Sequence, residues 1–267
     1  MKTLWMGLLC VPLTLAADDV YCKDGKVHRG LTLRREAGVI FGKHANPREG
    51  QEQDTILVAN QVERIVFAEP PALREVRQAA YAGDARQVLE KSGSLIAEHR
   101  QWAEMPGNYW RDLMRAQVPA LYVLGKNDEL QQLITAWLPT GEPDLEDSVK
   151  LLALRLNGSD QGAFLEICKK ATATGASTLV AAIAWIELGR AAAAEKQWPV
   201  AVRKFLAVEV FASSWRLLLP EALLGAARAC TANGQSVQAA LYAKELQSEF
   251  SRSEQASRVN EALSAPR

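Results

Sequence analysis

The chain has no surplus of charge of either sign. Lysine and arginine together number 31, aspartate and glutamate also number 31, and only three histidines are present. Proteins that bind the phosphate backbone of nucleic acids carry a marked excess of basic residues. The charge balance therefore argues against a nucleic-acid partner, and it does not indicate any other kind of partner.

Cysteine and histidine are scarce, and neither is spaced for a known site. The four cysteines (Cys10, Cys22, Cys168 and Cys230) form no C-x-x-C pair, so the sequence predicts neither a disulfide framework nor a structural zinc site. We interpret Cys168 and Cys230 as small core residues on helices, with a single disulfide bridge as the alternative.

The histidines lead to similar expectations. His28 and His44 lie near Cys22 in the sequence, but on different segments and without ligand spacing, so we predict no metal. We also predict no cofactor. His99 is a lone helix residue, which we expect to be solvated or to cap a helix.

Long apolar runs are missing except at the N-terminus. There, Lys2 precedes an apolar run from Leu4 to Leu15, which contains Pro12 and ends at Ala16-Ala17. This run is too short for a membrane span, which needs about 20 residues. Residues 1–17 are therefore predicted to be a secretory signal peptide cleaved near Ala16-Ala17, with an uncleaved anchor as the alternative.

The same segment sets the predicted location of the mature chain. Cys10 invites a lipid-attachment interpretation, but Leu9 stands where such a signal has a small residue. Loss of Lys2 with the signal leaves a net charge near −1, and no other stretch is long and apolar enough to cross a bilayer. We predict a periplasmic or secreted protein without a stable membrane span.

Residues 18–69 have the pattern of short strands separated by turns. Asp24-Gly25 is a strong hairpin signal, Gly30 predicts a bend, and the polar stretch Lys43–Asp54 predicts a loop. The predicted strands are Val20–Cys22, Val27–Arg35, Gly38–Phe41, Thr55–Val58 and Val62–Phe67. Five short strands, one of them bent, predict a small five-stranded β-barrel.

Residues 70–267 have a helical pattern that begins at the prolines Pro70 and Pro71. Tight turns separate helix-length segments at regular intervals, which predicts five helical hairpins. These turns are expected at Gly83, Gly125, Gly158, Lys196 and Gly234.

The fourth hairpin resembles a tetratricopeptide repeat. The residues that carry the resemblance are Trp185, Leu188-Gly189, the turn Lys196-Gln197, Ala201 and Phe205. Small residues such as Gly189 and Ala201 let two helices approach, while Trp185, Trp198 and Phe205 fill the space beside that contact. The last hairpin fits nearly as well, and the first three fit poorly, the second because Pro119 lies inside its first helix. The resemblance implies a mainly α protein with an α-solenoid of about five hairpins.

The N-terminal module carries a second resemblance. The segments VYCKDGKVHRGLTL and TILVANQVERIVF are similar to the small Sm-like or SH3-like barrels that follow signal peptides in bacterial envelope proteins. The RNA binding known for some Sm-like barrels is not expected of a secreted domain without a basic surplus.

The repeat resemblance also places candidate binding residues. In such stacks the first helices line a concave face, and five arginines fall at groove positions: Arg77, Arg115, Arg155, Arg190 and Arg228. Such a ladder is suited to holding carboxylates of an extended peptide. The alternative is that these arginines lie on solvated helix faces. The aromatic residues Trp102, Tyr109 and Trp110 are expected in the core at a hairpin junction, with a ligand-stacking platform as the alternative.

No catalytic motif is present. The sequence has no nucleophile elbow, H-E-x-x-H motif or phosphate-binding glycine loop. The sequence therefore predicts a non-catalytic scaffold that binds a polypeptide partner, expected to be a cell-envelope protein, through the concave face of the repeats. The alternative is a structural or oligomerising solenoid in which the barrel recognises a glycan or a peptide. The partner and the oligomeric state are not predicted.

Overall fold

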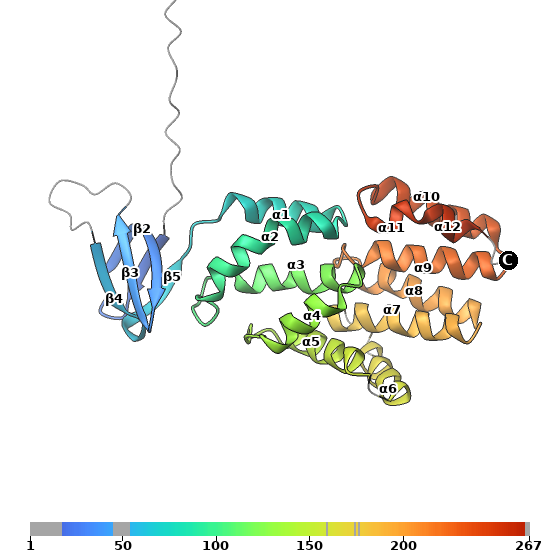
Figure 1. Cartoon of the computed structure of the whole chain (residues 1–267), viewed down its shortest axis with the longest axis horizontal. Coiled ribbons are helices and arrows are strands. Elements are labelled where there is room, and N and C mark those ends of the chain that lie inside the picture. The colour runs from blue at the N-terminus through green and yellow to red at the C-terminus, as the bar shows by residue number, and fades with distance from the viewer. Residues whose placement is uncertain (1–17, 45–53, 159, 174, 176, 265–267) are drawn as a thin grey trace, which may run out of the picture. The chain divides into compact units, whose positions relative to one another are not determined.

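A computed structural model describes residues 18–44, 54–158, 160–173, 175 and 177–264 of the chain (Figure 1). The predicted signal peptide and most of the predicted loop Lys43–Asp54 lie outside these residues. Helices make up 63% of the described residues. The chain divides into two compact units: a sheet unit, which ends at Pro70 and also includes Met105–Asn108, and a helical unit, which holds the remainder from Pro71.

The sheet unit contains five antiparallel strands in the order β4-β3-β2-β1-β5. Their bounds are β1 Asp18–Cys22, β2 Val27–Glu36, β3 Val39–His44, β4 Asp54–Val58 and β5 Val62–Val66, with a short 3-10 helix, η1, at Ala59–Gln61. All five predicted strands are present, and Lys43, His44 and Asp54 belong to strands instead of the predicted loop.

The predicted barrel is wrong, because the sheet is not closed. Closure would need hydrogen bonds between β4 and β5, which instead form opposite edges of the sheet. The only connection between them is η1, and none of its residues has a positive φ. Tight hairpin turns need positive φ angles, so the chain passes on to the far edge beside β1 and does not fold back onto β4.

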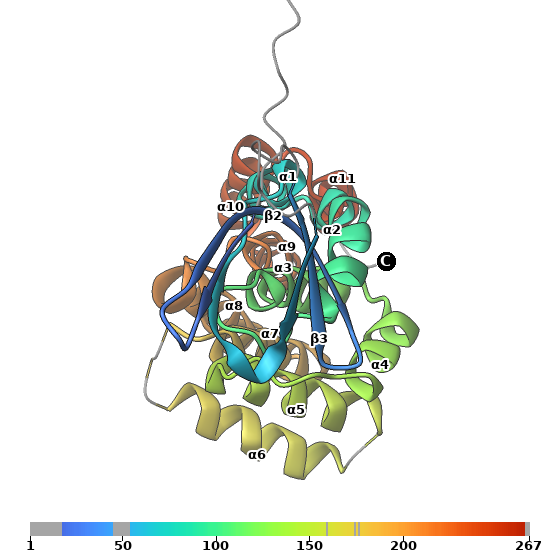
Figure 2. The same ribbon diagram turned by 90° about the vertical axis from the view of Figure 1, so that its left-hand side faces the viewer.

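The first hairpin and the bend follow the sequence prediction. Gly25 has a φ of 85° and donates its N–H to the carbonyl of Cys22 at 3.0 Å. Gly30 has a φ of 72° and lies beside a register shift between β1 and β2, so β2 bends there and the sheet curls (Figure 2). Curling brings Val20, Leu31 and Ile40 together as buried residues of the sheet unit.

The helical unit contains twelve α-helices within its described residues. The first ten pack as five consecutive pairs, α1/α2 to α9/α10. Their bounds are α1 Pro71–Tyr81, α2 Ala85–Arg100, α3 Trp110–Val123, α4 Asn127–Thr135, α5 Pro143–Leu156, α6 Gln161–Thr172, α7 Leu179–Ala194, α8 Trp198–Ala212, α9 Leu219–Ala232, α10 Ser236–Glu249, α11 Glu254–Ser257 and α12 Val259–Leu263. Each predicted turn lies inside one of the five pairs.

Four of these turns share one hydrogen-bond pattern. The N–H after the turn residue bonds to the carbonyl five residues earlier: Asp84 to Ala79, Lys126 to Leu121, Gln197 to Ala192 and Gln235 to Cys230. The turn residue has a positive φ in each case, which favours glycine. Lys196, with a φ of 59°, is the one that is not glycine.

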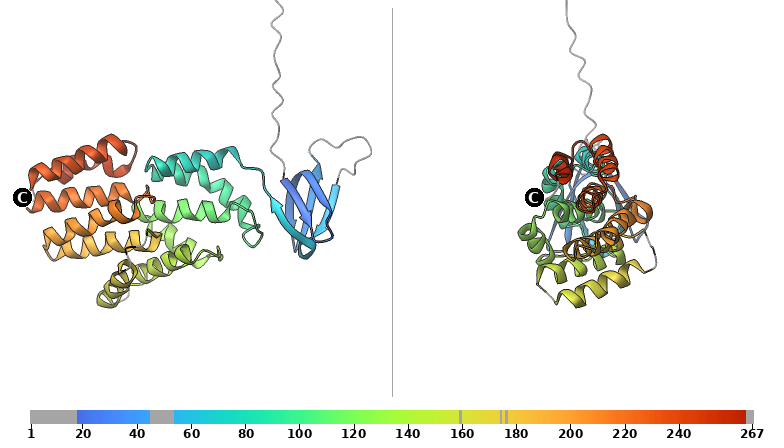
Figure 3. Two further views of the ribbon diagram at one scale, coloured as in Figure 1. Left: turned by 180° about the vertical axis from the view of Figure 1, so that it is seen from behind. Right: turned by 90° about the vertical axis from the view of Figure 1, so that its right-hand side faces the viewer.

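Successive pairs contact one another through their first helices, in the series α1, α3, α5, α7 and α9 (Figure 3). The last helices also reach the first pairs, which a simple stack of neighbours does not do. The amide of Gln255 on α11 donates to the carbonyl of Val123 on α3 at 3.1 Å. Arg86 on α2 pairs with Glu254 on α11 at 2.8 Å.

Close helix packing in the last two pairs depends on glycine, as the tetratricopeptide-like pattern predicts. A Cβ built on Gly189 would lie 2.8 Å from the Phe205 ring, and one built on Gly225 would lie 2.6 Å from it. Ala201 and Phe205 are buried. Gly225, on α9, contacts the same ring. The tetratricopeptide-like pattern did not single out this glycine.

Three expectations about individual residues have clear outcomes. Cys168 on α6 and Cys230 on α9 are free and buried, which confirms the core interpretation. The prediction that His99 is solvated is wrong, because His99 is only 3% exposed and meets the Tyr109 ring edge-on. The C-cap position of α2 is occupied by Gln101. His99 lies four residues after the buried Leu95 on the apolar stripe of α2. Trp110 is in the core of the helical unit, and Tyr109 packs against that core.

Candidate functional site

All five predicted groove arginines lie in the helical unit, and each forms an ion pair with an acidic residue of the same chain. The pairs are Arg77–Asp112 at 2.7 Å, Arg115–Glu142 at 3.4 Å, Arg155–Glu187 at 3.1 Å, Arg190–Glu221 at 2.8 Å and Arg228–Glu261 at 3.5 Å. Carboxylates do face the predicted ladder, but these carboxylates belong to the protein itself.

The ion pairs follow a regular pattern along the chain. Each arginine lies on the first helix of a pair, and its partner lies on or beside the first helix of the next pair, with α12 serving the last arginine. The residues joined by hydrogen bonds in this series are 27 to 35 positions apart in sequence. We call this series the arginine ladder.

The ladder is most buried around Tyr122 on α3. The Tyr122 hydroxyl donates to Glu187 on α7 at 2.7 Å, and Arg190 donates to the Tyr122 oxygen at 3.1 Å and to Glu187 at 2.7 Å. Burial lowers the pKa of Arg190, but Tyr122, Glu187 and Glu221 outweigh it and raise the pKa above its ordinary value. Arg190 is therefore held as a structural cation.

A pocket of about 330 Å³ lies between α1, α3 and the connection from α8 to α9. We call it the arginine–aromatic pocket, and its polar and aromatic lining consists of Arg77, Tyr81, Asp112, Arg115, Ser214, Trp215 and Arg216. Two of the five predicted arginines line it. Sequence reasoning missed Tyr81, Trp215 and Arg216, and the only available signal was the break at Ser213-Ser214 directly before Trp215.

The pocket combines cations with aromatic rings. The Arg115 guanidinium lies 5.1 Å from the Trp215 ring centre, and the Arg216 guanidinium lies 4.7 Å from the Tyr81 ring centre. Asp112 is the single acid in the lining, and it is paired with Arg77. Arg216 already donates its Nε–H to the Tyr81 carbonyl at 3.1 Å. A guanidinium placed over a ring can still offer N–H donors of its own plane, so this lining is suited to a carboxylate attached to an apolar group.

Arg115 also shares its acidic partner with another arginine. Glu142 at the start of α5 is shared between Arg111 at 3.3 Å and Arg115 at 3.4 Å. Arg216 has its own partner, Glu249, at 3.4 Å, and about half of the Glu249 side chain is exposed. Each of these three ion pairs is 3.3 to 3.4 Å long and has one partner that is about half exposed. Long ion pairs open to solvent are weak, so an incoming carboxylate can compete with them.

A second pocket of about 500 Å³ contains Arg190 and Arg228, the other two pocket-lining arginines of the ladder. Its lining includes Trp198 and Phe205, and the acids Glu221 and Glu261 pair with the two arginines. Because these charges cancel, this pocket has weaker electrostatic attraction for an anion than the arginine–aromatic pocket. Arg155 is in neither pocket.

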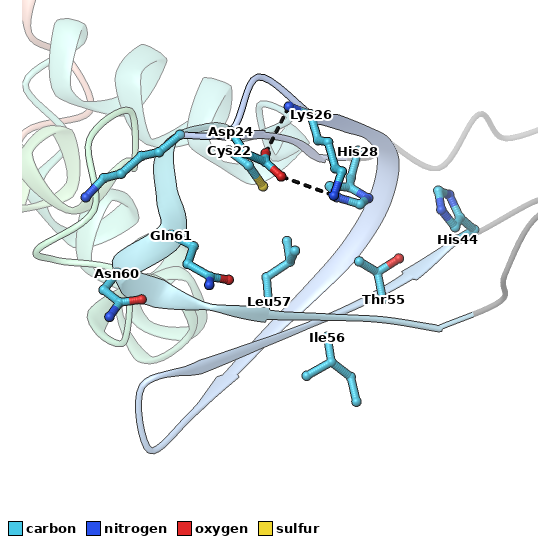
Figure 4. Close-up of a pocket in the computed structure, with 11 residues that line it drawn as sticks. Cys22, Asp24, Lys26, His28, His44, Thr55, Ile56, Leu57, Asn60 and Gln61 are labelled. Carbon is cyan, nitrogen blue, oxygen red and sulfur yellow. Dashed lines mark hydrogen bonds and ion pairs between the residues drawn. The ribbon is translucent and has the colours of Figure 1, made fainter.

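The sheet unit has a cavity of its own, with a volume of about 1100 Å³ (Figure 4). The cavity is lined by residues of β1 to β4 and η1, and they include Cys22, His28 and His44. The structure thus brings together three residues that sequence reasoning left apart. Across the described residues, no group of three or more His, Cys, Asp or Glu side chains is arranged to hold a metal ion.

The three cysteine thiols among the described residues do not have the properties of nucleophiles. Burial raises the pKa of Cys168 to about 12, and burial also raises the pKa values of Cys22 and Cys230. Thiols with raised pKa values are protonated near neutral pH and react slowly. Within the described part of the chain, no helix is long and apolar enough to cross a membrane.

Comparison of the chain with protein-family models, curated proteins and solved structures finds no match in any of the three.

Proposed function

We propose that this protein is a non-catalytic interaction scaffold, secreted or periplasmic, that binds a polypeptide partner through the first helices of its helical pairs. The N-terminal sequence pattern supports the location. The regular pairs, their turns and the Phe205 packing support a tetratricopeptide-like solenoid as the binding framework.

The arginine–aromatic pocket is the observation that carries this proposal. Its lining contains Arg77, Arg115 and Arg216, two rings and one acid, Asp112, in a volume suited to one or two side chains. The acids that pair with Arg115 and Arg216 lie outside the lining, at 3.4 Å in both cases. A polypeptide supplies the complementary groups, because a carboxylate and a neighbouring apolar side chain can engage the guanidinium groups and the rings together. An envelope protein with an acidic exposed segment is the expected partner.

A photo-crosslinking experiment on the full chain tests the proposal. A photoreactive amino acid replaces Ala80, which lines the pocket, or Gln238, which is exposed on α10 away from it. We expect a defined partner peptide to crosslink at position 80 in envelope extracts and not at position 238.

Charge reversal provides the matched control. Arg115→Glu combined with Arg216→Glu is expected to lower crosslinking at position 80 by about tenfold, whereas the exposed Arg203→Glu leaves it unchanged. Arg190 is unsuitable for this test, because its reversal breaks a buried network. Equal crosslinking at both positions, or yields insensitive to the double reversal, would contradict the proposal.

The sheet-unit cavity supports a second candidate function. In this alternative the helical unit is structural or oligomerising, and the sheet unit recognises a glycan or a peptide. Full-chain variants separate the two: Asn60→Ala with Gln61→Ala alters the cavity lining, and Arg115→Glu with Arg216→Glu alters the pocket. The pair of substitutions that abolishes partner capture identifies the recognition unit.

A further inference from the structure

The β4 strand has an unusually unprotected edge. It pairs only with β3, and no described strand pairs with its other side. Ile56 is 68% exposed and Val58 is 45% exposed. Edge strands normally carry lysine, proline or a bulge that discourages further pairing. β5, at the opposite edge, has Glu63 and Arg64, whereas β4 has only Asp54 at its first position.

The cavity of the sheet unit lies directly beside β4. Thr55 and Leu57 point into the cavity and Ile56 points away from it (Figure 4). Side chains alternate between the two faces of a strand, so a further strand laid along β4 would place every second side chain over the cavity. Its remaining side chains would lie beside Ile56 and Val58.

The cavity lining indicates the chemistry of those inward side chains. Lys23 and Lys26 are its basic residues, and Asp24 is its acid. Asp24 already pairs with Lys26 at 3.1 Å, which leaves a basic excess. Asn60 and Gln61 add amide donors. Acidic side chains therefore match the cavity, and apolar side chains match the outer face of β4.

We propose that the free edge of β4 binds an extended segment of a partner polypeptide by strand addition, with acidic side chains directed into the cavity and apolar side chains against Ile56 and Val58. Backbone hydrogen bonds along β4 supply affinity, and the alternating side chains supply specificity. This binding mode rests on the second candidate function, in which the sheet unit recognises a peptide, and it does not depend on the arginine–aromatic pocket.

A panel of labelled peptides tests the proposal on the full chain. Each peptide alternates glutamate with valine or isoleucine and has blocked ends. One matched panel has lysine for glutamate, and another has a central proline, which cannot complete a strand. We expect fluorescence anisotropy to show binding of the glutamate panel, with about tenfold weaker binding of the other two. Hydrogen exchange is expected to slow at Thr55–Val58 in the complex.

A charged substitution on β4 provides the control on the protein, as the peptide panels do on the ligand. Ile56→Lys is expected to weaken binding by about tenfold, while Val66→Lys, at a 48% exposed position on β5, leaves it unchanged. Circular dichroism verifies that both variants fold. The proposal is overturned if the glutamate panel binds no better than the proline panel, or if binding leaves exchange at β4 unaltered. It is also overturned if sedimentation shows a dimer of the chain that Ile56→Lys dissociates, because β4 would then be covered by a second copy.

Discussion

The Tyr122 hydroxyl on α3 donates a hydrogen bond of 2.7 Å to Glu187 on α7, and this bond joins the second helical pair directly to the fourth. Arg155 and Arg190 hold the same carboxylate at 3.1 and 2.7 Å. One buried carboxylate thus links three first helices of the helical unit.

The first prediction concerns this bond. Tyr122→Phe is expected to lower the free energy of unfolding by about 1–2 kcal/mol, because a buried hydrogen bond to a charged group is lost. Chemical denaturation followed by circular dichroism measures the change. Tyr242→Phe is the matched control, since the Tyr242 hydroxyl has no hydrogen bond to a described residue, and its effect should stay within about 0.5 kcal/mol. Equal losses in the two variants would contradict the role assigned to Tyr122.

A second prediction concerns the glycine beneath Phe205. Gly225→Ala is expected to destabilise the protein by about 1–3 kcal/mol, because its new methyl group would overlap the ring and force it to move. The drop in Tm measures the effect. A smaller side chain at position 205 should relieve the overlap. Gly225→Ala is therefore predicted to cause a smaller loss of stability in a Phe205→Leu background.

Gly93, in the middle of α2, is the matched control. A Cβ at Gly93 meets no atom within 4 Å. Gly93→Ala should therefore raise stability by up to about 1 kcal/mol, through the higher helix propensity of alanine. If both glycine-to-alanine changes had the same sign, the packing explanation for Gly225 would be wrong.

The third prediction uses the positive φ of Lys196. This conformation is unfavourable for a residue with a Cβ, so Lys196→Gly is expected to stabilise the protein by about 0.5–1 kcal/mol. Lys244→Gly makes the same substitution inside α10 and should destabilise by about 1 kcal/mol. Thermal unfolding of the two variants gives the comparison, and a loss of stability in Lys196→Gly would contradict the prediction.

A fourth prediction follows from the buried His99. Burial lowers the pKa of His99 from its ordinary value of 6.5, and the nearby Glu98 opposes this shift. Because the folded protein binds the proton less readily than the unfolded chain, the stability contributed by neutral His99 is present above pH 6.5 and is lost as the pH falls toward the lower folded pKa.

The measurement is denaturant unfolding of the wild-type chain and of His99→Phe at pH 7.5 and at mildly acidic pH. We expect the wild-type chain to lose more stability on acidification than the variant does. A variant that loses as much as the wild-type chain would assign the pH dependence to other groups.

Local features of the fold were predictable from sequence. The turn glycines and Lys196 marked all five helical pairs, and Asp24-Gly25 and Gly30 marked the hairpin and the bend. These signals succeed because positive φ angles and close helix contacts restrict the residue type at single positions. The strand positions followed from the turns that separate the short segments of residues 18–69.

Features that depend on long-range contacts were not predictable. Whether β4 meets β5 depends on the path of the chain through η1, which residue patterns did not reveal. The arginines of the ladder were recognised, but their acidic partners lie on the next first helix, about one repeat away in sequence. Trp215 and Arg216 line a pocket only because the α8–α9 connection reaches α1 and α3.

The arginine ladder also constrains how this architecture can change. Because each arginine is neutralised by an acid on the following first helix, every helical pair is matched to its successor. If two pairs were exchanged, or one were duplicated, an arginine would face a first helix whose acidic residue is placed to pair with a different arginine. The helical unit is therefore a sequence of non-interchangeable parts, and α12, through Glu261, completes the series for Arg228.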